Sequence, residues 1–166
     1  MSAYDSEMGY VKTFLELLKH PRCYFRDHLP GHLTASSLIM NEERSRVFMI
    51  YHAKLKKWLQ PGGHADGDED LYRVAKKEVL EETGLSDLKL LTPSIFDIDI
   101  HPIPARDEFP EHLHFDIRFA FEAKEDDRFV SNHESIQLGW KYLDELDTML
   151  ESNSSIGRMI LKAVRL

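Results

Sequence analysis

Three glutamates in one short segment have the residue type and the spacing that bind a hard cation. Glu78, Glu81 and Glu82 stand at positions i, i+3 and i+4 of a stretch whose apolar residues recur at helical spacing. A helix turns by about 100° per residue, so Glu78 and Glu82 fall on the same meridian as the apolar Leu71, with Glu81 within about a quarter turn. Amphipathic helices normally place carboxylates on the opposite face, and burying unpaired charge is costly. The pattern therefore predicts a cation among these carboxylates.

Oxygen-only ligands of this kind suit Mg²⁺ or Mn²⁺, and Mg²⁺ usually shares its shell with water and substrate phosphates. Gly62 and Gly63 precede the segment, and a glycine turn permits the close approach that brings a backbone carbonyl to the same ion. A divalent ion held in this way polarises phosphoryl oxygens, activates a water molecule and orients the leaving group. The chemistry predicted from these residues is therefore performed on a phosphorylated compound.

The composition is that of an ordinary globular protein. The chain has 166 residues, of which 42% are hydrophobic and 30% charged, which predicts one domain with a real core. The net charge of −8 argues against nucleic acid as a default partner, but a metal can carry the charge of a small phosphorylated ligand. The single cysteine, Cys23, excludes an internal disulfide and fits a reducing compartment. Neither a signal peptide nor a membrane span is recognised, so the expected location is the cytoplasm.

Helices are expected over three stretches, 6–19, 69–83 and 155–166. Asp68 is the expected N-cap of the central helix and Gly84 its C-terminal stop. Ser6 is the expected cap of the first helix, which Pro21 ends. This opening segment either packs on the main body or lies at a homodimer contact.

Strands are expected over six stretches, 32–40, 46–52, 58–60, 87–100, 112–122 and 135–142. The first two are joined by a polar turn, which predicts an antiparallel hairpin. Pro93 interrupts the fourth stretch, and the proline-rich 101–111 is expected to be a loop. The order of elements predicts an α+β or α/β sandwich with a mixed sheet, as one domain over 1–166 whose residues 1–31 form an N-terminal helical extension.

The stretch from Gly63 to Leu85 resembles the signature of the Nudix hydrolases, G-x5-E-x7-R-E-U-x-E-E-x-G-U, in which U is a bulky aliphatic residue. Every spacing is kept, and the residues at the fixed positions are Gly63, Glu69, Lys77, Glu78, Val79, Glu81, Glu82, Gly84 and Leu85. The one departure is Lys77 in place of arginine, which keeps the charge but loses the planar fork. The resemblance implies an α/β fold, the α/β/α sandwich with a mixed sheet, here preceded by an N-terminal helix.

The resemblance also implies a set of metal ligands. These are the Gly63 carbonyl, Glu78 and Glu82, with Glu81 beside them, and the ion is Mg²⁺ or Mn²⁺. The residue at position 77 is expected to orient the glutamates of the motif. Glu69 takes a structural or secondary position, because on a helical wheel it points nearly opposite Glu78.

The expected catalytic residues are Glu78, Glu81 and Glu82 together with one acid from outside the motif. We predict Glu134, just before the last strand, for that acid, with Glu111 and Asp116 as alternatives. A glutamate accepts the proton of the attacking water, and Glu78 is the first choice for this base.

One strand presents a second polar cluster. In 112–122 the apolar residues alternate with His112, His114, Asp116 and Arg118, which lie on one face. Two histidines and an aspartate at strand spacing suggest a transition-metal site, but along a straight strand the third ligand lies too far away. A polar face, solvated or lining a pocket, is the favoured interpretation.

The sequence therefore predicts a metal-dependent pyrophosphohydrolase. Its expected substrate is a small phosphorylated compound, a nucleoside diphosphate linked to another group, and the segments 22–31 and 101–111 are expected to determine specificity. The alternative is a non-catalytic nucleotide-binding sensor on the same fold. All motif glutamates are present, which favours the enzyme.

Overall fold

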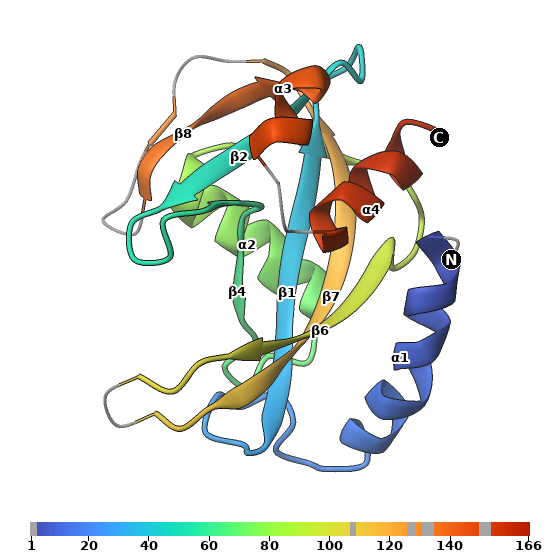
Figure 1. Ribbon diagram of the computed structural model, residues 1–166, viewed down its shortest axis with the longest axis vertical. Helices are drawn as coiled ribbons and strands as arrows, with labels where there is room; N and C mark the ends of the chain where they lie inside the picture. Colours follow the sequence, from blue (N-terminus) through green and yellow to red (C-terminus); the bar gives the residue numbers. More distant parts are fainter. Residues whose placement is uncertain (1–2, 107–108, 126–128, 131–134, 150–153) are drawn as a thin grey trace.

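The computed structural model describes residues 3–106, 109–125, 129–130, 135–149 and 154–166 (Figure 1). An eight-stranded mixed sheet forms the centre of this described part. Its strands are β1 (Gly31–Met40), β2 (Arg46–His52), β3 (Trp58–Leu59), β4 (Gly62–His64), β5 (Leu88–Leu90), β6 (Asp97–Ile103), β7 (His112–Ala123) and β8 (Ser135–Tyr142). The helices are α1 (Ala3–Leu17), α2 (Leu71–Thr83), α3 (Leu143–Met149) and α4 (Ser154–Ala163).

The parallel pair β1 and β7 forms the spine of the sheet. Their register runs from Gly31 opposite Leu113 to Met40 opposite Glu122. Helix α2 lies behind this pair and α4 in front of it (Figure 1). Two separate apolar clusters fill these layers, one containing Val74 and Ala75 of α2 and the other containing Ile156 and Met159 of α4. The α/β/α sandwich with a mixed sheet is therefore confirmed.

The predicted hairpin of β1 and β2 is confirmed only next to its turn. The strands β1 and β2 pair at Met40 and Val47 and then separate, because the rest of β2 pairs with β3 and β8. The short strand β4 occupies the place beside β1 that β2 leaves, with Ser36 opposite Gly62 and Thr34 opposite His64. This separation places Gly62 and Gly63, which were expected to form a turn, in strand β4 at the edge of β1 and shortly before α2.

Helix α2 begins later than the sequence indicated. It starts at Leu71, and its N-cap is Asp70 rather than Asp68, because the Asp70 side chain accepts a hydrogen bond from the Arg73 backbone N–H at 3.0 Å. Asp68 instead accepts from the Asp70 N–H at 2.9 Å and pairs with the Arg73 guanidinium. Gly84 ends the helix as expected, with a left-handed φ of 78°.

Three further boundaries differ from the expectation. Helix α1 begins at Ala3, so Ser6 lies inside it and is not its cap. Strand β6 continues through His101 to Ile103, a stretch expected to be loop, because β7 pairs with it along its whole length. The short helix α3 was not expected.

Helix α1 packs on the main body through one face. Phe14 and Leu17 are buried in the same apolar cluster as Phe115, and the rings of Phe14 and Phe115 lie 5.2 Å apart. Other large apolar side chains of α1 are exposed, namely Met8, Val11 and Leu15, as is Leu18 directly after the helix. A homodimer contact stays a prediction. None of the described helices is long and apolar enough to cross a membrane.

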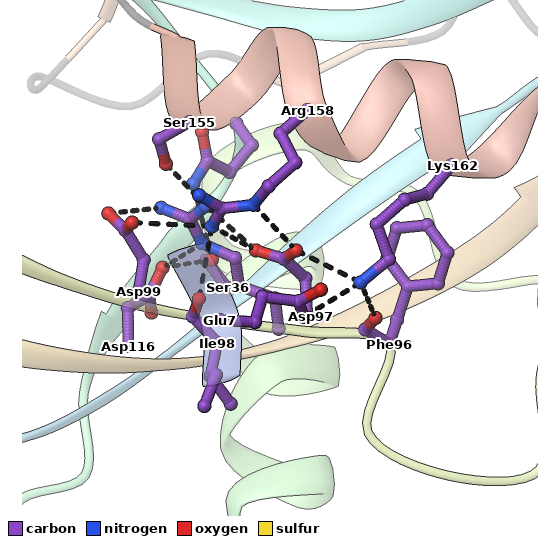
Figure 2. A network of polar contacts seen from close by, with 12 residues as sticks. Glu7, Ser36, Phe96, Asp97, Ile98, Asp99, Asp116, Ser155, Arg158 and Lys162 are labelled. Atoms are coloured by element: carbon purple, nitrogen blue, oxygen red, sulfur yellow. Dashed lines mark hydrogen bonds and ion pairs between the residues drawn. The ribbon is translucent and has the colours of Figure 1, made fainter. Parts of the chain in front are cut away.

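A buried network of ion pairs joins α4 to the polar middle of the sheet (Figure 2). At its centre Arg118, which is 2% exposed, donates hydrogen bonds to carboxylates of Asp116, Asp97 and Asp99 at 2.8, 3.2 and 3.0 Å. From α4, Arg158 pairs with Asp97 and Asp99, and Lys162 pairs with Asp97 and with Glu7 of α1. Burial alone would raise the pKa values of Asp97 and Asp99, but the arginines hold both below their usual range, helped at Asp97 by Lys162 and at Asp99 by a hydrogen bond with His101.

Replacing the central cation of this network should destabilise the fold. Arg118→Met leaves the carboxylates of β6 and β7 without their buried partner, and we expect a loss of about 3–5 kcal/mol in the free energy of unfolding. Urea denaturation followed by circular dichroism measures this loss.

The matched control is Arg73→Met, which removes an exposed arginine–aspartate pair whose Arg73 side chain is 66% exposed. A loss of about 1 kcal/mol or less is expected there. Equal losses in the two variants would contradict a special role for the buried network.

Candidate active site

The motif glutamates sit on the face of α2 that turns toward β1 and β4. Glu82 is 9% exposed, and its Oε2 accepts a hydrogen bond from the Gly62 backbone N–H at 2.9 Å. The Glu78 side chain is 17% exposed, whereas that of Glu81 is 55% exposed. The helical wheel is therefore confirmed: Glu78 and Glu82 point inward, and Glu81 lies at the rim.

The glycine turn leaves room for these carboxylates. A Cβ atom at Gly63 would lie 2.6 Å from the Oε2 of Glu78, so the Glu78 carboxylate rests directly against the Gly63 backbone. A Cβ atom at Gly62 would lie 2.7 Å from the Ala35 carbonyl oxygen of β1. At Gly62 a side chain would meet the backbone of β1, so glycine is required there on steric grounds, whereas a side chain at Gly63 would displace the Glu78 carboxylate.

The donor set fits a divalent cation. Glu78 approaches the Gly63 backbone, and Glu82 accepts a hydrogen bond from the adjacent Gly62 N–H, so two carboxylates lie against the same pair of glycines. Hard oxygen donors of this kind suit Mg²⁺ or Mn²⁺. The partly buried position also reduces the screening of their charge by water.

Lys77 lies beside the glutamates at the outer rim. Its Nζ is 3.9 Å from the Oε1 of Glu78 and 3.7 Å from the Oε1 of Glu81. These separations are those of loose ion pairs, and the side chain is 60% exposed. Lysine thus partly neutralises two motif carboxylates at the position where the motif has arginine.

Glu69 precedes α2 and does not belong to the helix. It is exposed in the bend before Asp70. The wheel argument that placed it opposite Glu78 therefore does not apply to it. The secondary position expected for it stays a prediction.

Comparison with known proteins then decides the family. The profile of the NUDIX domain matches residues 30–162. The chain belongs to the Nudix family.

Solved structures share the Nudix fold at low sequence identity. An E. coli dihydroneopterin triphosphate pyrophosphohydrolase superposes with a TM-score of 0.64 at 14% identity, over 81% of this chain and 96% of that chain. A MutT protein from Methanosarcina mazei Go1 gives 0.61 at 20% identity, over 82% and 94% of the two chains. A C. elegans Ap4A hydrolase gives 0.58 at 15%, over 80% and 96%. No curated protein matches the sequence significantly.

Two of the three candidates for the acid from outside the Nudix motif lie among the described residues. Glu134 lies outside the described residues. Asp116 is 3% exposed and accepts hydrogen bonds from Thr34 and Ser36 at 3.0 and 2.7 Å as well as from Arg118. Asp116 is thus committed to the buried network. Glu111 is exposed just before β7.

Histidines from several strands gather on the sheet face opposite the glutamates. The rings of His32, His64, His112 and His114 have neighbouring centroids 4.9–5.2 Å apart, and His101 lies 5.5 Å from His114. The sequence singled out His112 and His114 but paired them with Asp116, which instead belongs to the arginine network. The partners missed, His32 and His64, come from other strands and give no local signal.

Burial favours the neutral form of three of these imidazoles, those of His32, His64 and His114. It lowers the pKa of His114 to about 2 and that of His64 to about 4, and it lowers the pKa of His32 as well. Neighbouring histidines act in the same direction. The favoured interpretation for this strand was a polar face, solvated or lining a pocket. In the structure His114 packs among the rings of His32, His64 and His112.

A methyl group at position 63 should disrupt the Nudix site without unfolding the protein. Gly63→Ala places a carbon where the Glu78 carboxylate rests, and a displacement of about 1 Å can reduce the rate about a hundredfold. Rate measurements over a Mg²⁺ titration, with circular dichroism for the fold, test this.

Gly157→Ala is the matched control, because a Cβ atom there meets nothing within 4 Å. It should leave rate and Mg²⁺ dependence unchanged. A fully active Gly63→Ala variant would show that the close contact with Glu78 is not needed.

Substitutions of Lys77 should have small effects. An exposed ion pair contributes about 0–1 kcal/mol, so Lys77→Met should lower kcat by no more than about fivefold. Lys77→Arg should restore or exceed the wild-type rate, because a guanidinium can donate to both glutamates. A loss of about a hundredfold in Lys77→Met, measured at saturating Mg²⁺, would instead give Lys77 a direct part in the reaction.

Proposed function

We propose that this Nudix hydrolase uses Mg²⁺ or Mn²⁺ to hydrolyse a phosphoanhydride bond in a nucleoside diphosphate linked to another group. The observation that carries the proposal is the contact of Glu78 with the Gly63 backbone beside the hydrogen bond from Gly62 to Glu82. This arrangement fixes two carboxylates and a backbone segment around one position. The proposed metal ligands are the Gly63 carbonyl, Glu78, Glu81 and Glu82.

Each residue of the site has a defined part in this proposal. A divalent ion, when bound, polarises phosphoryl oxygens and lowers the pKa of water. The hydrogen bond from Gly62 orients Glu82, and the Gly63 backbone limits the positions open to Glu78. Glu78 is the proposed base that accepts a proton from the attacking water, and Glu81 adds a carboxylate at the solvent-exposed rim. Glu134 stays the proposed acid from outside the motif.

One of the two segments expected to determine specificity, 22–31, contacts the turn that precedes α2. The connector before β1 contacts the turn before α2, since the Gly67 N–H donates to the Tyr24 carbonyl at 2.8 Å and Arg26 pairs with Asp66. The same connector contacts β7, because the Leu113 N–H donates to the Pro30 carbonyl at 2.8 Å. These contacts support a role for 22–31 in recognising the group linked to the diphosphate, and the role of 101–111 stays a prediction.

The proposal extends to the partners, the location and the domain organisation of the protein. The net charge of −8 supports a small phosphorylated substrate in the cytoplasm, with neither nucleic acid nor a membrane as partner. The contact of α1 with the sheet supports one domain over 1–166. The exposed apolar residues of α1 leave a homodimer as part of the proposal.

A substrate panel with Mg²⁺ tests the proposed activity. It contains nucleoside triphosphates, dinucleotides, nucleotide sugars and nucleotide coenzymes, with Ap4A and dihydroneopterin triphosphate added because the neighbours are named for them. We expect release of pyrophosphate, or of a nucleoside monophosphate and a phosphorylated product. Glu82→Gln should lower the rate at least about a hundredfold, with the fold retained.

Glu16→Gln is the control, because it removes an exposed carboxylate that pairs only with Lys19 among the described contacts. It should keep the wild-type rate. Tight nucleotide binding without turnover across the panel would favour the sensor, and a fully active Glu82→Gln would remove Glu82 from the ligand set.

A further inference from the structure

Three histidines from three strands converge on the face of the sheet that α2 does not cover. The ligand atoms of His32, His64 and His114 all lie within 4.8 Å of one another. The strand register fixes this meeting: His32 of β1 lies opposite His114 of β7, and His64 of β4 lies opposite Thr34 of β1. Their backbones are therefore held by the sheet and not by a loop.

Two of these histidines present ring nitrogens with no hydrogen-bond partner among the described residues. These are the buried Nε2 atoms of His32 and His114, and the residue His32 is 1% exposed. The Nδ1 of His32 lies 3.3 Å from the His28 carbonyl, so the proton belongs on Nδ1 and the lone pair on Nε2. A carbonyl that orients an imidazole through its other nitrogen is the usual outer partner of a metal-ligating histidine.

We propose that His32, His64 and His114 form a binding site for a first-row transition ion, with Zn²⁺ as the best match. Imidazole nitrogens suit Zn, Cu, Ni and Fe, and three of them leave the fourth tetrahedral position open. Zn–N bonds of about 2.0–2.1 Å place the nitrogens about 3.4 Å apart. The separations of up to 4.8 Å therefore close when the rings move inward by roughly 1 Å.

The neighbouring side chains limit where these rings can go. His112 stacks on His32 with ring centroids 5.0 Å apart, and its Nδ1 lies 2.8 Å from the Pro110 carbonyl. His101 flanks His114, and the Nδ1 of His101 lies 3.2 Å from the Oδ2 of Asp99. The three ligands are thus enclosed by rings that are themselves anchored.

The site is distinct from the proposed carboxylate site, although both use β4. Successive side chains of a strand point to opposite faces: position 63 faces Glu78 of α2, and His64 faces the histidines. The two sites also differ in donor atoms, oxygen on one face and nitrogen on the other. The histidine site should therefore hold Zn²⁺ in the presence of excess Mg²⁺.

Metal analysis of the full-length protein tests this inference without reference to activity. The protein is stripped with a chelator, equilibrated with Zn²⁺ in excess Mg²⁺, passed through a desalting column and analysed by inductively coupled plasma mass spectrometry. We expect one Zn²⁺ per chain in the wild type. Co²⁺ in its place should give the visible absorption of a tetrahedral nitrogen-ligated ion.

His114→Asn should lose the bound Zn²⁺ and the Co²⁺ spectrum, with His64→Asn as a second variant should the first fail to fold. His20→Asn, which changes an exposed histidine outside the cluster, should keep both. Glu78→Gln/Glu82→Gln should also keep both, even where it abolishes hydrolysis.

Two results would overturn the inference. One is a wild-type protein that retains no Zn²⁺ in excess Mg²⁺, which would leave the cluster as stacked neutral imidazoles. The other is Zn²⁺ that survives in the folded histidine variants but is lost in Glu78→Gln/Glu82→Gln, which would assign the ion to the carboxylates. Neither result depends on whether the proposed substrate class is correct.

Discussion

The close approach of the α2 carboxylates to the backbone of β4 is the constraint on which the site depends. No side chain fits between them, because a Cβ atom at Gly63 would meet Glu78 and one at Gly62 would meet β1. The Gly62 N–H then directs Glu82. The helix, its burial against β1 and the glycine turn thus form one geometric unit, and changing any part displaces the charged groups.

That constraint depends on how the sheet divides. If β2 had remained paired with β1, no edge would have been available for β4, and the glycine turn would not face α2. The pairing of β2 with β8 releases this edge. A hairpin is the natural expectation for neighbouring strands joined by a short turn. Here β2 pairs with β1 at one residue pair only and otherwise pairs with the distant strand β8.

The sequence therefore predicted features that depend on local periodicity and missed those that depend on register. Glu78 and Glu82 were placed correctly because a helical wheel needs only residue spacing. The cap is Asp70 rather than Asp68, because two nearby aspartates both offer an acceptor and Asp70 takes the Arg73 N–H while Asp68 takes the Asp70 N–H. Asp116 and His114 were grouped by strand spacing, yet their partners come from β1, β4 and β6, and a single strand carries no information on its neighbours.

The order of residues along one face of the sheet explains why charge and neutral imidazole are kept apart. On the face covered by α4, β1 and β7 first present Leu38 and Ala120, then Ser36 and Arg118, and finally His32 and His114. The cations of α4 reach the middle rows, where they balance the aspartates. The α4 contacts described in the network do not include the histidine row, where burial favours neutral rings. Each row of this face therefore has a different partner. Side chains of α4 pack on the apolar row and pair with the ionic row. By our inference, a metal ion binds the row of neutral imidazoles.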